Sequence, residues 1–478
     1  MSVSESMSDV LAERYASRAM REIWAPEAKV IRERELWIMV LRAQVSAGLK
    51  ISSDEITRYE KVVDKVDLRS IEDRERRLRH DVKARIEEFN ELAKSQSIHL
   101  GMTSRDVTET IEATQIRDSL FLTYQRATAL IQQLAIRAEE FKDLVIVGRS
   151  HNVPAQLTTL GKRFATVTEE FLFALERLEN LIDRYPFRGL RGPVGSAQDM
   201  TDLLGADSHL QIEKLVAKEL GFERILDSTA QIYPRSIDFE VLSTLVQLAA
   251  GPSSFATTLR LMAGLGHISE GFKEGQVGSS AMPHKVNARS SERINGLSVV
   301  LKGHLSMISE ISGDQWNEGD VSCSVVRRVA LPGAFFALDG IFQAFATILK
   351  EMKVFPGRIE LEVRENLPFL VTTRLLTEAV KKGMGREDAH KIIQRHSLHA
   401  AEMINLGKEA NLFLDLASDP DFPLSEAEIS ALASDPLNLL GDALDQVDRV
   451  VARVRRLELR KPHSSFKISK SEGFEEII

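Results

Sequence analysis

One stretch in the N-terminal third of the chain decides the fold: residues 116–141 read IRDSLFLTYQRATALIQQLAIRAEEF. Its apolar residues and alanines recur at spacings of three and four, with one slip, which places them on one stripe of a long helix. Residues 164–181 and 331–352 repeat the pattern, and residues 294–311 carry a weaker stripe that His304 interrupts. Spacing this close to a heptad favours helices that pack at shallow angles in a bundle.

The rest of the chain is also typical of helices. Glycine and proline together make up about 9% of the 478 residues, against roughly 12% on average. No sustained alternation of apolar and polar residues marks a sheet, and residues 144–147 predict at most one short strand. We therefore expect an all-α protein of three helical domains with a central long-helix bundle. The predicted domains are an N-terminal helical domain (1–111), the central bundle (112–357) and a C-terminal helical domain (358–478).

Charge and cysteine content exclude several classes of protein. With 62 basic and 70 acidic residues, the net charge is −8, which argues against partners such as nucleic acid or an anionic membrane. The single cysteine, Cys323, excludes an intramolecular disulfide and a cysteine-cluster metal site. The first twenty residues lack the apolar stretch of a signal peptide, and no window approaches the roughly 18 apolar residues of a membrane span. A soluble, cytoplasmic protein is the simplest expectation.

Common catalytic and nucleotide-binding motifs are missing from the sequence. It contains no Gly-x4-Gly-Lys-[Ser/Thr] phosphate loop, no His-Glu-x-x-His and no Gly-x-Ser-x-Gly. The eleven histidines are scattered, and none pairs with acidic neighbours at metal-ligand spacing. The sequence therefore predicts no metal site.

The sharpest segment is residues 276–287, which read QVGSSAMPHKVN. It is polar, contains glycine and proline, and precedes a long predicted helix. Such a loop can direct backbone N–H groups and Lys285 towards an anion. A plain connection between helices is the alternative interpretation for most loops of this composition.

Three blocks in this order resemble the fumarase/aspartase superfamily, whose members eliminate fumarate from succinyl substrates. Residues 276–287 match its Gly-Ser-Ser-x-Met-Pro-x-Lys-x-Asn signature. Residues 101–106, GMTSRD, are similar to the first block, and residues 148–151, GRSH, with residues 158–162, TTLGK, to the second. The resemblance implies a fumarase/aspartase-like all-α fold.

Five further features narrow the resemblance. They are Arg14-Tyr15, Arg79-His80-Asp81-Val82, Gln231 before Tyr233-Pro234-Arg235, His284, and Arg328 in Arg327-Arg328-Val-Ala-Leu-Pro332. With them the chain resembles the adenylosuccinate lyase family, from about Arg14 to Asp388. This resemblance implies elimination of fumarate from adenylosuccinate and from the succinylated aminoimidazole carboxamide ribotide of purine synthesis.

The resemblance assigns the catalytic roles. Ser279 is the implied base, which removes the proton from carbon, and His151 is the implied acid, which protonates the leaving nitrogen. That proton lies on the carbon next to a carboxylate, so its removal creates a dianion. Lys285 with Asn287 can stabilise this dianion, so neither a metal nor another cofactor is needed. His80 is expected to orient His151 or to contact the substrate.

The same resemblance implies a set of substrate-binding residues. Thr103 and Ser104 are expected to hold one carboxylate, with Ser280 assisting at a carboxylate. Gln231 is expected to bind a carboxylate or a base edge, whereas Arg235 is as easily structural. The expected phosphate contacts are Arg14, Tyr15, Ser324 and Arg328. Arg79 and Asp81, the two charged residues of the motif around His80, are also expected to bind substrate.

Five residues depart from the family pattern. Ser150 stands where threonine is usual, Asn152-Val153 where a glutamine often follows the histidine, and Ala288 where proline is common. Gly319 stands where related bacterial enzymes have an arginine. We therefore expect other residues to complete the phosphate or succinyl pocket there.

Two alternatives stay open. A sister lyase acting on argininosuccinate, aspartate or malate would leave Arg14 and Arg79 without a phosphate to bind. A non-catalytic protein on the same fold, as some lens crystallins are, would have no need of Ser279, Lys285 and His151. The resemblance also implies a homotetramer whose active sites are shared between subunits, with nucleotides as the small-molecule partners.

Overall fold

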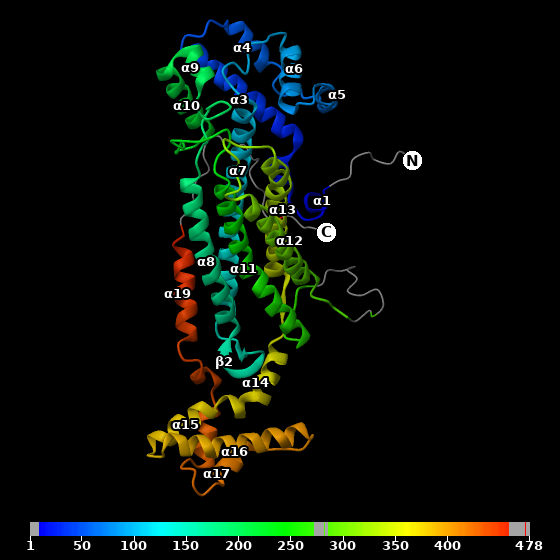
Figure 1. Ribbon diagram of the computed structural model, residues 1–478. Helices are drawn as coiled ribbons and strands as arrows, with labels where there is room; N and C mark the ends of the chain where they lie inside the picture. Colours follow the sequence, from blue (N-terminus) through cyan, green and yellow to red (C-terminus); the bar gives the residue numbers. More distant parts are fainter. Residues whose placement is uncertain (1–8, 272–281, 283–284, 458–473, 475–478) are drawn as a thin grey trace.

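The structure is a computed structural model that describes residues 9–271, 282, 285–457 and 474. Its N-terminal part consists of short helices and one longer helix, α3; α3 to α6 lie at the upper end of the molecule in Figure 1, and α1 lies lower, beside α13 (Ser322–Glu351). Side chains that accept hydrogen bonds from first-turn amides begin several of these helices, among them Ser17, Ser52 and Asp67. The elements are α1 (Val10–Arg14), α2 (Arg18–Trp24), α3 (Pro26–Ser46), α4 (Ser53–Glu60), α5 (Leu68–Leu78) and α6 (Asp81–Ala93).

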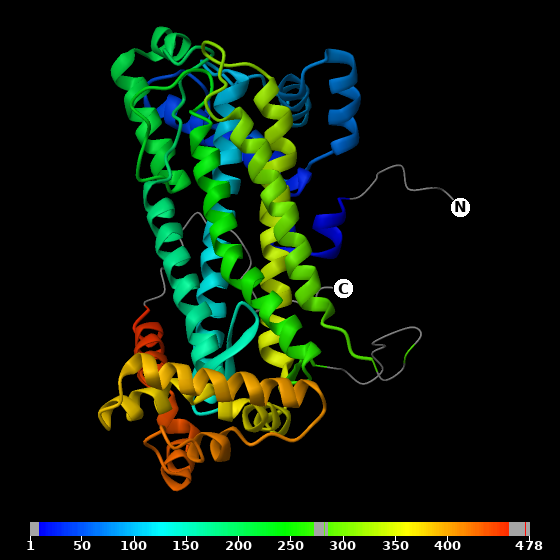
Figure 2. The same cartoon turned by 60° about the horizontal axis from the view of Figure 1, so that its bottom comes forward.

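Five long helices form the central bundle, which runs along the length of the molecule (Figures 1 and 2). Helix α12 packs on α11 and α13, α11 also packs on α8, and α7 packs on α8 and α13. The prediction of an all-α fold with a central long-helix bundle is confirmed. The five helices are α7 (Ser104–Glu140), α8 (Leu160–Arg184), α11 (Ser236–Gly264), α12 (Arg289–Ile311) and α13 (Ser322–Glu351).

The apolar stripes read from the sequence form the core of this bundle. They lie on α7, α8 and α13, and the weaker stripe lies on α12, where His304 is also buried. Helix α13 is long and apolar enough to cross a membrane, but 89% of its most apolar window is buried within the protein, as in a core helix. Fully or almost fully buried members of the stripes include Ile116, Leu120, Tyr124, Phe164, Leu178, Leu331, Phe335 and Phe342.

A β-hairpin at the lower end of the bundle corrects the expectation of at most one short strand. Strand β1 (Val145–Ser150) pairs antiparallel with β2 (Val153–Thr159), and a bulge falls between Gly148 and Arg149. The second strand escaped sequence analysis because its first four residues are exposed or half-buried, so their side chains need not alternate between apolar and polar. Two further short strands, β3 (Ile268–Ser269) and β4 (Lys353–Val354), pair with each other. Helices α9 (Gln198–Leu204) and α10 (Ala206–Leu220) lie at the upper end of the molecule, where α10 packs on α3 (Figure 1).

The C-terminal helices cross the lower end of the bundle (Figure 2). They have a core of their own, which includes Leu375, Ile393 and Leu416. The last helix, α19, returns to pack along α7 and α8. The boundaries proposed from the sequence for the three domains remain a prediction. The elements are α14 (Pro356–Leu370), α15 (Thr372–Lys381), α16 (Arg386–Asn405), α17 (Leu412–Ala417), α18 (Glu426–Ala433), the 3-10 helix at Pro436–Leu439, and α19 (Ala443–Arg455).

Candidate active site

The first motif block lies at the N-terminus of α7. Thr103 precedes the helix in an extended conformation, and its amide donates to Asp106 Oδ2 at 2.8 Å. Asp106 is fully buried and also accepts from Arg188 Nη1 at 2.7 Å, which ties a distant loop to this helix end. Thr103 and Ser104 are half-buried here, where the positive end of the helix favours an anion. The position suits the carboxylate-binding role expected of them.

The Arg79-His80-Asp81 motif joins α5 to α6. Arg79 ends α5 with a left-handed backbone (φ 56°), and His80 begins α6, with its Nδ1 accepting from the Lys83 amide at 3.2 Å. This hydrogen bond needs Nδ1 to be unprotonated and leaves the proton of a neutral ring on Nε2. The imidazole is about half exposed, with Nε2 as its hydrogen-bond donor.

A contact between distant parts of the chain brings this motif to α13. Arg328 Nη2 donates to Asp81 Oδ2 at 3.1 Å, and Arg85 Nη2 donates to the same oxygen at 3.4 Å. Burial alone would raise the pKa of Asp81, but Arg85, the Val82 amide and Arg328 outweigh burial, and the pKa lies below its usual value. Asp81 is therefore an ionised carboxylate that positions Arg328.

Arg105 is a binding candidate that sequence reasoning missed, although it stands inside the first motif block. Its Nη2 donates to Ser324 Oγ at 2.7 Å and to the carbonyl oxygen of Asp320 at 3.3 Å. Gly319 has φ 131°, and a side chain there would press on Ile232, so an arginine does not fit this backbone. Arg105 thus places a guanidinium beside the position where the family pattern has one.

These residues form one group, which we call the upper cluster. Ser324 and Arg328 are one helical turn apart on the same face of α13. The amide of Gln231 donates to the carbonyl of Glu318 at 3.0 Å, which brings its segment against the loop before α13. The upper cluster comprises Arg79, His80, Asp81, Thr103, Ser104, Arg105, Gln231, Ser324 and Arg328.

A buried ionic network supports the upper cluster from below. Arg235 donates through both terminal nitrogens to Glu109, at 2.9 and 2.8 Å, and Arg327 Nε donates to Asp238 at 2.8 Å. Burial would raise the pKa of Glu109, but Arg235 and Arg327 lower it below its usual value. Both arginines are almost fully buried, so Arg235 is structural. Of the two neighbouring arginines on α13, Arg327 belongs to the buried network and Arg328 to the upper cluster.

A half-buried histidine in the same region, His99, was also missed. Trp37 Nε1 donates to His99 Nδ1 at 3.0 Å, so the ring proton of neutral His99 lies on Nε2. Burial lowers the pKa of His99 to about 4, although Asp106 opposes this effect. His99 is therefore a neutral donor near pH 7, and its place two residues before Gly101 was the signal that could have identified it.

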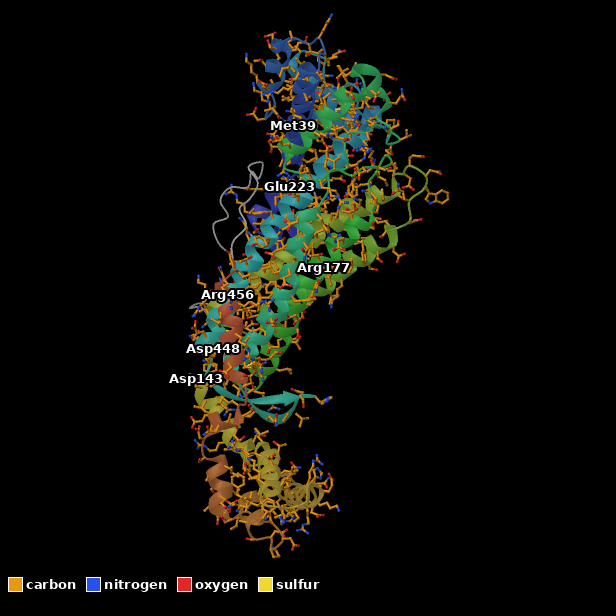
Figure 3. The ribbon with its side chains drawn as sticks, turned by 90° about the vertical axis from the view of Figure 1, so that its left-hand side faces the viewer. Met39, Asp143, Arg177, Glu223, Asp448 and Arg456 are labelled. Atoms are coloured by element: carbon orange, nitrogen blue, oxygen red, sulfur yellow. The ribbon has the colours of Figure 1, made fainter. Side chains whose placement is uncertain are left out.

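His151 lies at the opposite end of the bundle from His80 (Figure 1). It is exposed at the tip of the β-hairpin, and His151 and Asn152 both have left-handed backbones, with φ of 52° and 62°. Figure 3 shows the hairpin projecting from the side of the bundle. Within one chain, the two histidines expected to cooperate do not meet.

The signature segment is only partly described. Ser279, Ser280 and His284 lie outside the described residues, so the assignment of the base stays a prediction. Lys285 is exposed and Asn287 half-buried, and both line a hollow beside α11 and the start of α12. The start of α12 is fixed by Glu270, whose carboxylate accepts from the amides of Ser290 (2.9 Å) and Ser291 (2.7 Å).

The expected phosphate-binding set is divided within one chain. Arg14 is exposed and Tyr15 half-buried at the end of α1, and the Arg293 guanidinium lies 6.0 Å from the centre of the Tyr15 ring. Tyr15 packs against α13 at Gly340, roughly 18 Å along that helix from Arg328 at 1.5 Å per residue. A single chain therefore does not bring Arg14 and Tyr15 to Ser324 and Arg328.

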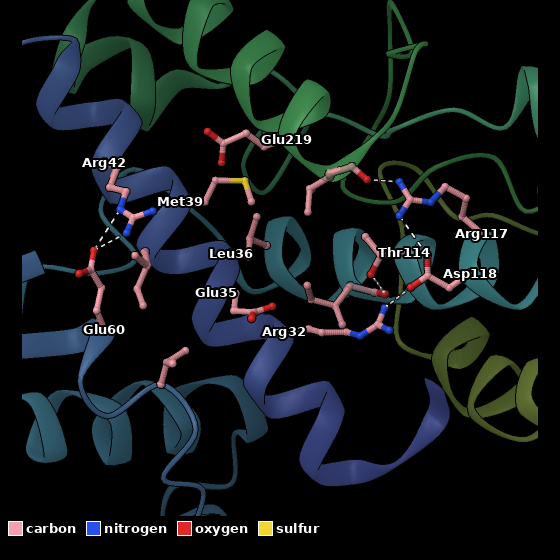
Figure 4. Close-up of a pocket in the computed structure, with 14 residues that line it drawn as sticks. Arg32, Glu35, Leu36, Met39, Arg42, Glu60, Thr114, Arg117, Asp118 and Glu219 are labelled. Carbon is pink, nitrogen blue, oxygen red and sulfur yellow. Dashed lines mark hydrogen bonds and ion pairs between the residues drawn. The ribbon is translucent and has the colours of Figure 1, made fainter. Parts of the chain in front are cut away.

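A separate cavity of about 330 Å³ lies between α3, α7 and α10 (Figure 4). Arg32 and Arg117 donate to the two oxygens of Asp118, at 2.8 and 3.0 Å, in its wall. None of the site residues expected from the sequence lines it. In the described part of the chain, no three His, Cys, Asp or Glu side chains are grouped as a metal site requires.

Comparison with known proteins agrees with the motifs. Residues 5–303 match the family described as Lyase, and residues 368–450 match the family described as Adenylosuccinate lyase C-terminus. Among solved structures, a fumarate lyase from Mesorhizobium sp. BNC1 superposes with a TM-score of 0.80 at 22% identity, covering 92% of this chain and 99% of that one. A 3-carboxy-cis,cis-muconate lactonizing enzyme from Pseudomonas putida gives 0.81 at 21% identity, covering 94% and 99%. Fold and motifs thus define a lyase of the fumarase/aspartase superfamily.

Curated relatives narrow this class. The adenylosuccinate lyase of Schistosoma mansoni is 32% identical over 452 residues, covering 93% of this chain and 94% of the relative. That of Saccharomyces cerevisiae is also 32% identical over 452 residues, covering 93% of each. That of Pyrococcus abyssi is 30% identical over 461 residues, covering 94% of this chain and 98% of the relative. The chain belongs to the adenylosuccinate lyase family.

Proposed function

We propose that the protein cleaves adenylosuccinate to AMP and fumarate, and the succinylated aminoimidazole carboxamide ribotide to the aminoimidazole carboxamide ribotide and fumarate, in purine biosynthesis. The observation that carries this proposal is the likeness to adenylosuccinate lyases over nearly the whole chain. The upper cluster supports it, because Arg328 and Arg105 offer two guanidinium groups beside Ser324, as a phosphate-bearing substrate requires.

The proposed reaction is a β-elimination. Ser279 takes the proton from the carbon next to a carboxylate, the carbon–nitrogen bond breaks, and the electron pair of the C–H bond forms the double bond of fumarate. Lys285 and Asn287 stabilise the dianion that develops at the carboxylate. The leaving nitrogen takes its proton from His151, since a purine amine is a poor leaving group as an anion.

We propose that the active site is shared between subunits of a homotetramer. Three sets of expected site residues are separated in one chain: the upper cluster, the hairpin tip with His151, and the region of Arg14 and Lys285. Association of subunits would bring such sets together. Exposed apolar side chains along the bundle support association, because burying them in an interface is favourable. They include Leu261, Val299, Val300, Met307, Val325 and Val329.

The proposed site needs no metal and no other cofactor, because lysine, amide and hydroxyl groups supply the stabilisation. Activity is therefore expected to survive exhaustive chelation, and a loss that zinc or magnesium restores would contradict the proposal. We place the enzyme in the cytoplasm, with nucleotides as its small-molecule partners and with neither nucleic acid nor membrane as a partner.

The deciding experiment follows fumarate release by the purified protein. Adenylosuccinate is expected to release fumarate and AMP in equal amounts, whereas argininosuccinate, aspartate and malate are expected to release none. Release from one of those three instead would identify a sister lyase. Absence of release from all of them by folded protein would favour a non-catalytic role.

A further inference from the structure

The tip of the hairpin needs an anchor, because burial does not hold it. His151, Asn152 and Val153 are all exposed. The two-residue turn requires left-handed backbones at both His151 and Asn152, which asparagine adopts readily and histidine less so. The adjoining bulge between Gly148 and Arg149 also interrupts the ladder of hydrogen bonds.

Arg149 connects this tip to helix α14. Its Nη1 donates to the carbonyl oxygen of Asn152 at 3.1 Å, and its Nη2 donates to Glu362 Oε1. The side chain of Glu362 is 12% exposed and that of Arg149 23%, so water screens this pair less than an ordinary surface pair. One guanidinium thus joins the backbone of the turn to a carboxylate of the C-terminal region.

Glu362 also interacts with two further basic side chains, His267 and Arg163. Its second oxygen lies 3.4 Å from Nε2 of the buried His267. Burial lowers the pKa of Arg163, and Glu362 acts against this shift while Arg149 adds to it. Removal of the carboxylate would therefore leave Arg149 and Arg163 facing each other as like charges, with no acidic group at Glu362 to hold the hairpin.

We propose that Glu362 is a positioning residue that acts through Arg149 to hold His151 where it protonates the leaving nitrogen. This inference rests on the proposed function. A general acid must lie within hydrogen-bond reach of the atom it protonates, and a misplacement of about 1 Å can lower the rate about a hundredfold. Glu362 never touches the substrate in this scheme, so its loss acts on turnover and not on binding.

The first test measures the hairpin itself. In E362A, the amides of residues 145–159 are expected to exchange with solvent roughly tenfold faster, because the tie to α14 is lost. The matched control is E360A, on the same helix, which removes an exposed pair with Arg364. E362Q, which keeps an acceptor for Arg149, should exchange at an intermediate rate and serves if E362A does not fold. Unchanged exchange in a folded E362A or E362Q contradicts the proposal.

The second test separates positioning from general stability. E362A is expected to lower kcat about tenfold to a hundredfold with KM changed less than about threefold, whereas E360A leaves both unchanged. In a protein that already carries His151→Ala, E362A should lower kcat little further. An equal loss in both backgrounds would show that Glu362 does not act through His151. If the wild-type protein releases no fumarate, the proposed function fails, while the exchange measurement still decides whether Glu362 anchors the hairpin.

Discussion

The two histidines expected to act in catalysis are held in contrasting ways. His80 begins a helix, its Nδ1 is bound by an amide, and the neighbouring Asp81 is ion-paired to Arg328 above a buried ionic network. His151 stands on an exposed hairpin tip that is tied to the rest of the protein through Arg149. The surroundings of His80 are thus held by contacts from several elements, whereas the exposed tip with His151 is tied to α14 through one arginine.

The largest effect is expected at the tip. His151→Ala should lower single-turnover fumarate release about 10²–10⁴-fold, because the leaving nitrogen would depart unprotonated. Substrate binding, measured by calorimetry, should persist, since the contacts of the upper cluster remain. Val153→Thr, at the neighbouring exposed position, should have little effect. Near-normal turnover by His151→Ala would show that His151 is not the general acid.

In the upper cluster, the expected effect is on binding. Arg105→Ala should raise KM for adenylosuccinate about tenfold to a hundredfold, because a charged hydrogen bond contributes roughly 1.5–3 kcal/mol. Thermal melting must accompany this measurement, since Arg105 also pairs with Glu109 at 3.3 Å. Arg105→Lys keeps the charge and should lose less affinity. An unchanged KM in a folded Arg105→Ala protein would show that Arg105 does not bind substrate.

A smaller effect concerns stability and pH. The pKa of His99 is about 4 when folded and 6.5 when unfolded, so the unfolded chain binds more protons below pH 6.5. Its contribution to stability is thus fully present above pH 6.5 and is lost progressively as pH falls towards 4, about 2 kcal/mol by pH 5. Urea unfolding at pH 7 and pH 5 should show this loss in the wild type and not in His99→Gln. Equal losses in the two proteins would contradict the assignment.

Mixing two inactive variants tests directly whether His80 and His151 of one site come from different subunits, and the expected recovery of activity is modest. If His80 and His151 of one site come from different subunits, mixing inactive His80→Ala and His151→Ala proteins should restore up to about a quarter of the wild-type rate. Native mass spectrometry can verify that subunits have exchanged. No recovery in verified hybrids would contradict the proposal that His80 and His151 of different subunits serve the same site.

The bundle was predictable because its helices bury one face each. The stripe in residues 116–141 identified α7 directly, and similar stripes identified α8 and α13. Helix α11 was missed, because it is apolar on much of its surface and contains Pro252, so no single stripe stands out. The second strand of the hairpin was missed because its outward side chains do not pack in a core.

The candidate site was predictable only as a collection of motifs. Motif residues such as His80, Thr103 and Ser324 were identified, but their grouping depends on contacts such as Asp81 with Arg328, which are 247 residues apart. Arg105 was overlooked because the family pattern leaves its position open. Glu362 lies in no motif, and only the folded chain brings it to Arg149.

The C-terminal helices are attached to the rest of the protein at both of their ends. Helices α15 to α18 are inserted between α14, which packs on the hairpin, and α19, which packs along α7 and α8. Because the chain enters this insert from a helix packed on the hairpin and leaves it into a helix packed on the bundle, the insert is tethered at both ends, whereas a terminal segment is tethered at one. Deletion of α15 to α18 would therefore remove none of the five helices of the central bundle.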